Sequence, residues 1–145
     1  MTALLDEVRN EIVELHNFFT EWFNGTAERE QLEERLISRL HSDFVFVPPE
    51  GTLMKREHLA DGFQRGFGSN KDFRIQIRDV VVRHGMGNRV LATYTEWQVG
   101  AKLSGQVNNA RVTTVLLEMG QPITWLHIQE TWLPETVRAA GSFDF

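Results

Sequence analysis

Two glutamates and a tyrosine are the residues of this chain whose types and positions suit acid–base chemistry. Glu130 shares one face of a predicted strand with Ile128 and Trp132, while Tyr94 and Glu96 share one face of an earlier predicted strand. Burial raises the pKa of a carboxylic acid, so a glutamate among apolar neighbours could act as a general base or acid near neutral pH. Tyr94 could donate a hydrogen bond to an oxyanion that develops on a carbonyl group.

The strands that must position these side chains lie in the second half of the chain. Residues 111–118 and 123–133 are joined by a turn-prone break that ends in Gly120-Gln121-Pro122, which predicts an antiparallel hairpin. Two stretches before them, residues 73–82 and 89–99, alternate with a period of two and are separated by a glycine-rich turn. A long turn is predicted at Ser104-Gly105 and Asn108-Asn109.

The first half of the chain is predicted to be mainly helical. Apolar residues recur at three- and four-residue steps from Leu4 to Phe23, which indicates a long amphipathic helix that ends at Asn24-Gly25. Further helices are expected over residues 27–40 and 56–67, with a short strand at 44–47 between them. Helices segregated from a curved antiparallel sheet define an α+β fold, and we expect one domain over residues 1–145.

Alternation predicts which side chains lie on the concave face of the curved sheet. We expect the odd-numbered residues of the first long strand and the even-numbered residues of the next three strands to point inward. The polar residues expected there are Asp79, Tyr94, Glu96, Thr114 and Glu130. The outer face is expected to expose an apolar set that would serve as a homodimer interface, namely Trp97, Trp125, Val115 and Leu117.

The polar residues also have plain structural interpretations. A glutamate at a strand end can pair with an arginine near the cavity mouth, with Arg111, Arg89 and Arg74 as the available partners. Tyr94 can fill the core with one hydrogen bond, and Asp79 can cap a turn. Trp22 can be a core residue or can roof the pocket.

Composition narrows the class of protein. The chain has 145 residues, a net charge of −5 and no cysteine, which argues against nucleic-acid binding and excludes disulfides and thiolate chemistry. Its histidines lie on separate elements without metal-ligand spacing, so we expect neither metal nor cofactor. No signal-like or membrane-spanning stretch is present, and we expect a cytoplasmic protein that does not bind membranes.

The order of elements resembles the nuclear transport factor 2-like superfamily. The resemblance is carried by Phe18-Phe19-Thr20-Glu21-Trp22, by Asp43-Phe44 leading to Pro49-Glu50-Gly51, by Ile77-Arg78-Asp79-Val80, and by Leu126 to Thr131. Within the superfamily the chain is similar to the SnoaL-like branch and to the association domain of calcium/calmodulin-dependent protein kinase II. In that domain a basic residue stands where this chain has Glu130. The resemblance implies a cone-shaped, cystatin-like roll capped by three N-terminal helices, and dimers that pair through the outer sheet face.

Three functions remain open from the sequence. The first is binding of a small apolar or carbonyl-bearing molecule in an apolar, partly acidic cavity, with Trp22, Asp79, Thr114, Ile128 and Trp132 as contact residues. The second is an isomerase or hydratase in which Glu96 or Glu130 moves a proton and Tyr94 stabilises the oxyanion. The third is a dimerising scaffold without a ligand.

Overall fold

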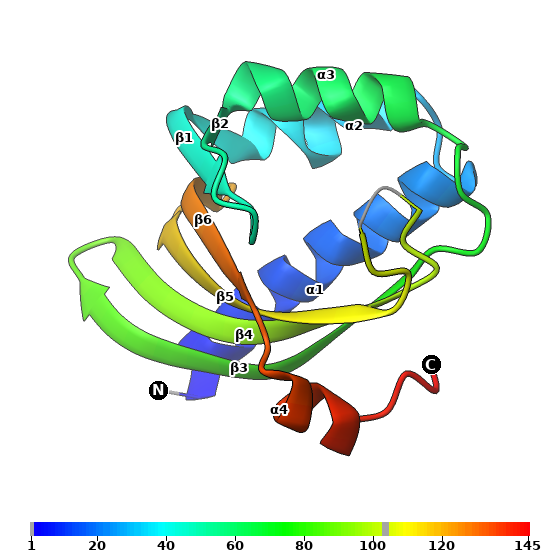
Figure 1. Ribbon diagram of the computed structural model, residues 1–145. Coiled ribbons are helices and arrows are strands. Elements are labelled where there is room, and N and C mark those ends of the chain that lie inside the picture. Colours follow the sequence, from blue (N-terminus) through cyan, green and yellow to red (C-terminus); the bar gives the residue numbers. More distant parts are fainter. Residues whose placement is uncertain (1, 103–104) are drawn as a thin grey trace.

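A curved sheet wraps around the long N-terminal helix in the computed structural model, which describes residues 2–102 and 105–145 (Figure 1). The six strands lie in the order β2-β1-β6-β5-β4-β3. All neighbouring pairs are antiparallel except β1 and β6, which run parallel. The bounds are β1 Leu40–Val47, β2 Met54–Lys55, β3 Arg74–Met86, β4 Arg89–Val99, β5 Asn109–Glu118 and β6 Thr124–Trp132. The predicted α+β class is confirmed, although the alternation pattern did not reveal the parallel pair.

The helices cover the concave side of this sheet, apart from a short one at the C-terminal end. Helix α1, Thr2–Asn24, ends at the predicted position and packs an apolar stripe into the core, with Val8, Ile12, Leu15, Phe18 and Trp22 buried. Helix α3, Arg56–Gly66, lies across the open side of the cone (Figure 1). No helix in the described parts of the chain is long and apolar enough to span a membrane.

The predicted second helix, residues 27–40, is shorter and interrupted. The backbone amides of Thr26 and Ala27 both donate to the carbonyl of Glu21, so a turn and not a second helix follows the end of α1. Helix α2 therefore spans only Gln31–Arg35, and a 3-10 turn follows at Ile37–Arg39. Leu40 already belongs to β1, because the buried side chains of Leu36 and Leu40 anchor this segment against the core.

The inward faces of β4 and β5 are set by their register. Tyr94 and Glu96 of β4 are buried, as predicted. Directly opposite residues point to the same side of a sheet, and Glu96 pairs with Arg111 while Tyr94 pairs with Thr113. The prediction for β5 is therefore wrong, since its odd-numbered residues face inward. Thr114 lies on the outer side, and Val115 and Leu117 are fully buried instead of exposed.

A bulge in β3 changes the face of the residues that follow it. The register with β4 shifts between Arg78 and Val81, and Asp79 takes a left-handed backbone conformation with φ of 59°. Asp79 is exposed and accepts a hydrogen bond of 3.0 Å from the Thr95 hydroxyl. Its predicted place in the cavity is wrong, and the turn-like interpretation describes it better.

A second register shift affects the start of β6. It falls between Leu116 and Leu117 of β5, and it turns Trp125 to the inner side. Trp125 is fully buried, and its indole nitrogen donates to a carboxylate oxygen of Glu11 at 2.8 Å. The expectation that Trp125 lies on the outer face is therefore wrong.

The C-terminal segment covers part of the convex face. Helix α4, Glu135–Ala140, which the sequence pattern did not predict, leads into a tail that lies on the opposite side of the sheet from α3 (Figure 1). The Phe143 and Trp97 rings have centroids 5.3 Å apart, and the Arg78 guanidinium stacks 4.2 Å from the Trp97 ring and donates to the Ser142 carbonyl at 2.5 Å. Trp97 is only 4% exposed, so its predicted exposure is wrong.

The predicted long turn between β4 and β5 is confirmed where the structure describes it, except that Asn109 is already the first residue of β5. The Ala101 amide donates to the Val107 carbonyl at 2.8 Å, and the Asn108 side chain accepts from the Gly100 amide at 3.3 Å. Gly100 has a φ of 74° and lies against the backbone of Asp72, where a larger residue would clash. Ser104 lies outside the described residues.

Candidate functional site

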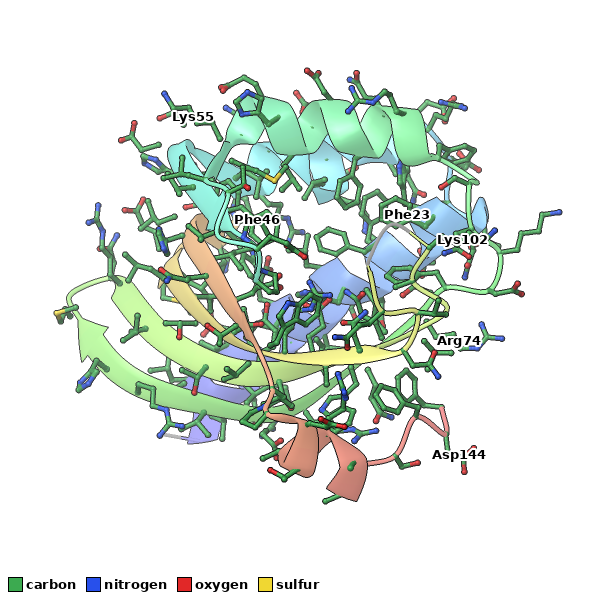
Figure 2. The ribbon with its side chains drawn as sticks, viewed as in Figure 1. Phe23, Phe46, Lys55, Arg74, Lys102 and Asp144 are labelled. Carbon is green, nitrogen blue, oxygen red and sulfur yellow. The ribbon has the colours of Figure 1, made fainter. Side chains whose placement is uncertain are left out.

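Two adjoining cavities lie between the concave sheet face, α1 and α3. The inner chamber has a volume of about 160 Å³ and the outer chamber about 630 Å³. Figure 2 shows Phe23 and Phe46 in the space between α3 and the sheet. Residues that line both chambers are Phe23, Phe46, Phe73, Gln98 and Arg111. The two chambers therefore adjoin and share aromatic walls.

The polar side chains of the inner chamber come from distant parts of the sequence. They are His16 from α1, Tyr94, Glu96 and Gln98 from β4, Arg111 from β5, and Glu130 from β6. Each of these residues is less than 10% exposed. Buried charges are costly unless they are paired, so their partners decide what the cluster can do.

His16 and Glu96 form a buried ion pair. The His16 Nδ1–H donates to the Ile12 carbonyl at 2.8 Å, and its Nε2 lies 3.1 Å from Glu96 Oε1. The other carboxylate oxygen of Glu96 accepts from Gln98 Nε2 at 2.6 Å. Burial opposes both charges, but their mutual attraction and hydrogen bond outweigh it, which lowers the pKa of Glu96 to about 2 and raises the pKa of His16. Glu96 therefore stays ionised at neutral pH.

Glu130 and Arg111 form the second pair, with a distance of 2.8 Å from Arg111 Nη1 to Glu130 Oε1. Arg111 Nη2 donates to Asn109 Oδ1 at 2.7 Å and to Gln98 Oε1 at 3.2 Å. Burial and the nearby charge of Glu96 raise the pKa of Glu130 to about 7 despite the attraction of Arg111. Glu130 is thus a carboxyl group that gains or loses its proton near neutral pH.

Tyr94 contributes a neutral phenol to the chamber. Its hydroxyl lies 3.5 Å from His16 Nε2, and burial together with the two glutamate charges raises its pKa well above the ordinary value. Thr113, opposite Tyr94 and Glu130 on the neighbouring strands, is fully buried. Within the described residues, the Arg111 Nε–H has no hydrogen-bond partner.

The structure brings together some of the predicted site residues and separates others. Tyr94, Glu96, Glu130 and Ile128 line the inner chamber, and Trp132 lines the outer one. Trp22 lines neither chamber: its indole donates to the Phe63 carbonyl at 2.7 Å and ties α1 to α3 in the core. Asp79 and Thr114 lie on the opposite side of the sheet.

The structure also tests the interpretation in which a glutamate pairs with an arginine. Arg111, one of the suggested partners, binds Glu130, whereas Arg89 pairs with Glu118 at 3.4 Å near the other end of the strands. The Arg111 guanidinium also stacks 4.8 Å from the Trp132 ring. The arginine therefore lies inside the cavity, beside the glutamate that titrates near neutral pH.

Sequence reasoning missed His16 and Arg111 as site residues. A signal for His16 existed, because it interrupts the apolar stripe of α1 one turn after Ile12. Arg111 was assigned to the outer face because Val112 and Leu116 made the even-numbered face of β5 look apolar. Only the register with Glu96 places the Arg111 guanidinium inside.

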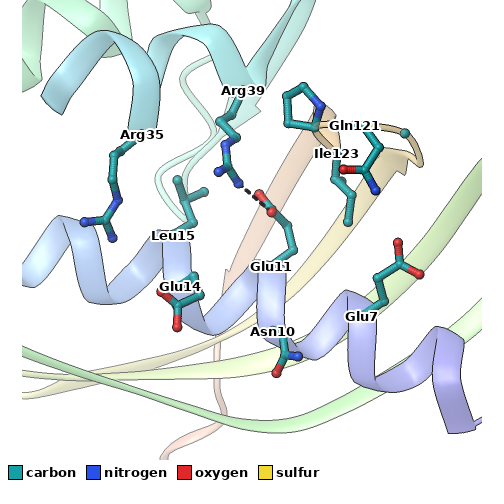
Figure 3. A pocket seen from close by; sticks show the side chains of 11 residues that line it. Glu7, Asn10, Glu11, Glu14, Leu15, Arg35, Arg39, Gln121 and Ile123 are labelled. Carbon is teal, nitrogen blue, oxygen red and sulfur yellow. Dashed lines mark hydrogen bonds and ion pairs between the residues drawn. The ribbon is translucent and has the colours of Figure 1, made fainter.

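A second pocket, of about 400 Å³, lies on the surface between α1, α2 and the β5–β6 turn (Figure 3). The carboxylate of Glu11 is already bound there, by Arg39 Nη1 at 2.7 Å and by the Trp125 indole. The polar residues Glu7, Asn10 and Glu14 are exposed to solvent. This pocket lacks the buried titratable cluster, so the two-chamber cavity is the stronger candidate site. Among the described residues no group of three or more histidine, cysteine or acidic side chains is arranged to hold a metal ion.

The curved sheet around a long helix, with a cavity inside, is the nuclear transport factor 2-like fold. The structure matches that of an NTF2-like protein of unknown function from Pseudomonas aeruginosa with a TM-score of 0.78, at 24% identity over 88% of this chain and 99% of the other. A ketosteroid isomerase-like protein from Erwinia carotovora atroseptica matches with a TM-score of 0.57, at 13% identity over 90% of this chain and 96% of the other. At these identities the matches show the fold alone.

Sequence comparison identifies the family within this fold. The model of the sucrose-6-phosphate phosphohydrolase C-terminal family matches residues 8–134, and the chain belongs to that family. Two relatives from Arabidopsis thaliana, named "Probable sucrose-phosphatase 3a" and "Probable sucrose-phosphatase 2", are 29% and 26% identical over alignments of 133 residues that cover 88% of this chain. The chain spans only 30% and 31% of the lengths of these relatives. The sequence motifs alone did not suggest this family.

Proposed function

We propose that the protein binds a small molecule that has an apolar body and a polar head group. The head group would lie in the inner chamber against Glu130 and Arg111, and the body would lie among the aromatic side chains of the outer chamber. The observation that carries this proposal is a buried cluster of charged groups at one end of an aromatic-lined cavity. Small-molecule sites combine apolar walls with a few convergent polar groups in this way.

The buried charged groups of the inner chamber are not needed to make the core stable. Replacing a buried ion pair by well-packed apolar residues is often neutral or stabilising, so a core that only had to be stable would gain little from two such pairs. The two pairs His16–Glu96 and Arg111–Glu130 share one small chamber. Buried groups with perturbed pKa values that line a cavity are typical of functional sites.

The names of the relatives point to sucrose phosphate chemistry in longer proteins. A sugar phosphate presents hydroxyl groups on most of its surface. The outer chamber has polar residues such as Asn70 and Lys102 in its lining, but most of its exposed wall is apolar, with Phe23, Phe46, Phe73, Met54 and Trp132. Such walls suit a less polar ligand, because burying hydroxyl groups without hydrogen bonds is unfavourable. For this domain we therefore favour a ligand with an apolar body over a sugar phosphate.

Ligand titration followed by tryptophan fluorescence tests the proposal. Trp132 lines the outer chamber, so binding should change its emission. Suitable probes are octanoate, octanamide, 4-phenylbutyrate and 4-phenylbutanamide. The variant Trp132→Phe should lose the signal change, while Trp97→Phe, beyond the sheet from the cavity, should keep it. Absence of binding by all four probes in calorimetry would overturn the proposal.

A proton-transfer enzyme is the second candidate function. The pKa of Glu130 near neutrality and the neutral phenol of Tyr94 are the features that an isomerase or hydratase would use. Exchange of α-protons of ketones into deuterated water, followed by NMR, measures this activity directly. Loss of the exchange in both Glu130→Gln and Tyr94→Phe would support catalysis. Equal rates in these variants and the parent protein would rule it out.

We also propose that the protein forms a homodimer through the part of the convex face that the C-terminal tail leaves free. Val81 and Val112 are 38% and 37% exposed on that side. Exposed apolar residues on a sheet favour association with a second copy. Sedimentation of Val112→Lys against the parent protein tests this interface: a dimer that persists unchanged in the variant would exclude it.

A further inference from the structure

Arg111 carries more donor capacity than the protein uses. Its Nη1 binds Glu130 and its Nη2 binds Asn109 and Gln98, but its Nε–H has no partner among the described residues. The residue is only 8% exposed and lines both chambers. An unsatisfied buried donor on a charged group is unfavourable, so this position favours a ligand that brings a hydrogen-bond acceptor.

The charges of the inner chamber specify what kind of acceptor fits. His16 and Glu96 cancel each other as an ion pair. The charge of Arg111 is balanced only while Glu130 is ionised. When Glu130 carries a proton, the chamber holds one uncompensated positive charge, which a bound monoanion would neutralise.

We infer that the head group of the ligand is a carboxylate that accepts hydrogen bonds from Arg111 and takes over the charge-balancing role of Glu130, which becomes protonated as the ligand binds. This inference rests on the proposed function and names the ligand class of the same site. The proton comes from solvent: one ionised Glu130 and one proton give the neutral acid. A protonated Glu130 can then donate a hydrogen bond to the incoming carboxylate.

The surroundings of Glu130 support this exchange. The groups that face it are Arg111 from β5, Glu96 and Tyr94 from β4, and His16 from α1. Glu96 is too acidic to take the proton near neutral pH, because His16 holds its pKa at about 2. Glu50, in the loop that follows β1, adds a negative charge that acts on Arg111, and Lys102 lines the outer chamber. Deprotonation of His16 at higher pH would also oppose an anion, so the test must isolate Glu130.

Calorimetry with matched carboxylate and amide probes tests the inference. Octanoate and 4-phenylbutyrate should bind about tenfold more weakly at pH 8 than at pH 6, because only the fraction of protein with a protonated Glu130 accepts the anion. At pH 8, titrations in buffers of different ionisation enthalpy should show uptake of about one proton per carboxylate bound. Octanamide and 4-phenylbutanamide should show neither effect.

Two variants separate Glu130 from the other groups. In Glu130→Gln the side chain is neutral at every pH, so carboxylate affinity should vary little between pH 6 and pH 8 and proton uptake should disappear. Glu118→Gln is the matched control on β5, since its carboxylate is partly exposed and pairs with Arg89 away from the cavity. This control should retain both the tenfold pH effect and the proton uptake of the parent protein.

The outcomes distinguish this inference from the proposed function. Amides that bind as tightly as the carboxylates, or carboxylates that bind without proton uptake at pH 8, would overturn the inference and leave small-molecule binding intact. Binding by none of the four probes would overturn both. A pH effect that persists unchanged in Glu130→Gln would assign the titration to another group and would also overturn the inference.

Discussion

Glu96 and Glu130 line the same chamber, yet their pKa values lie far apart, at about 2 and about 7. The difference comes from their partners. His16 faces Glu96 directly at 3.1 Å, so the ionised form of Glu96 is favoured. Glu130 is paired with Arg111, but it is buried and lies near the negative charge of Glu96. Burial and this charge oppose the ionisation of Glu130 and raise its pKa. One glutamate therefore supplies a fixed charge and the other supplies a movable proton.

Glu130 should make the stability of the protein depend on pH in the direction opposite to that of an ordinary ion-paired carboxylate. Its pKa rises from 4.5 to about 7 on folding, so the folded state binds a proton more tightly than the unfolded state does. Stability is then lost as pH rises through this range, by an amount on the order of 3 kcal/mol. Urea unfolding at pH 5 and pH 8 should show Glu130→Gln gaining stability relative to the parent as pH rises. If the free energies of unfolding of Glu130→Gln and the parent protein differed by the same amount at both pH values, Glu130 would not be the group with the raised pKa.

The His16–Glu96 pair should be costly to break and less costly to replace as a unit. Glu96→Gln leaves His16 without its charge partner, and we expect a loss of about 3–5 kcal/mol in the free energy of unfolding. The double variant His16→Phe with Glu96→Leu removes both charges and should recover a large part of that loss. A double-mutant cycle made of His16→Phe, Glu96→Leu and the double variant, followed by urea unfolding, measures the coupling. Additive effects of the two substitutions would show that the pair is not coupled.

Asp79 should tolerate exchange for asparagine but not for a branched residue. Its φ of 59° is accessible to aspartate and asparagine, whereas valine is strained there by about 1–2 kcal/mol. Thermal unfolding should therefore rank Asp79→Asn close to the parent and Asp79→Val below it. Ligand affinity should be unchanged in Asp79→Asn, because the residue lies outside both chambers. A loss of affinity in that variant would place Asp79 in the site after all.

Gly141 should be needed for the C-terminal tail to lie on Trp97. A Cβ atom at this position would stand 2.1 Å from the indole ring, which is far inside a normal contact. Gly141→Ala should therefore lift the tail and shift Trp97 fluorescence to longer wavelength. Gly85→Ala is the matched control, because an added Cβ there meets nothing within 4 Å. A spectrum of Gly141→Ala that matches the control would show that the tail adapts without leaving the ring.

Much of the fold could be predicted from the sequence because its signals are local. The step of three and four residues in α1 and the alternation in β4 each reflect one buried face, and both elements have the expected bounds. The break in the second predicted helix, the helix α4 and the parallel pairing of β1 with β6 could not be predicted in this way. They depend on contacts such as Thr26 with Glu21, or Leu40 with Trp125, that no periodicity encodes.

The candidate site was only partly predictable for a related reason. Tyr94, Glu96 and Glu130 stand out because each interrupts an apolar face of its strand. Arg111 does not stand out, since both faces of β5 carry apolar residues and only pairing with Glu96 decides between them. Bulges in β3 and β6 invert the alternation at Asp79 and Trp125, and a pattern of period two carries no sign of them.

The parallel pairing of β1 with β6 has a consequence for how the protein is made. Leu40 lies beside Trp125 in this pair, so β1 cannot join the sheet until β6 has left the ribosome. Long-range pairings of this kind slow folding, because the chain must lose conformational entropy to bring distant segments together before their contacts can stabilise the fold. Until then the part of α1 that contacts Trp125 of β6 has no cover, and the nascent chain is more exposed to aggregation and to chaperones. The same step brings Glu130 of β6 to Arg111 of β5, so the candidate site is complete only once β6 has paired.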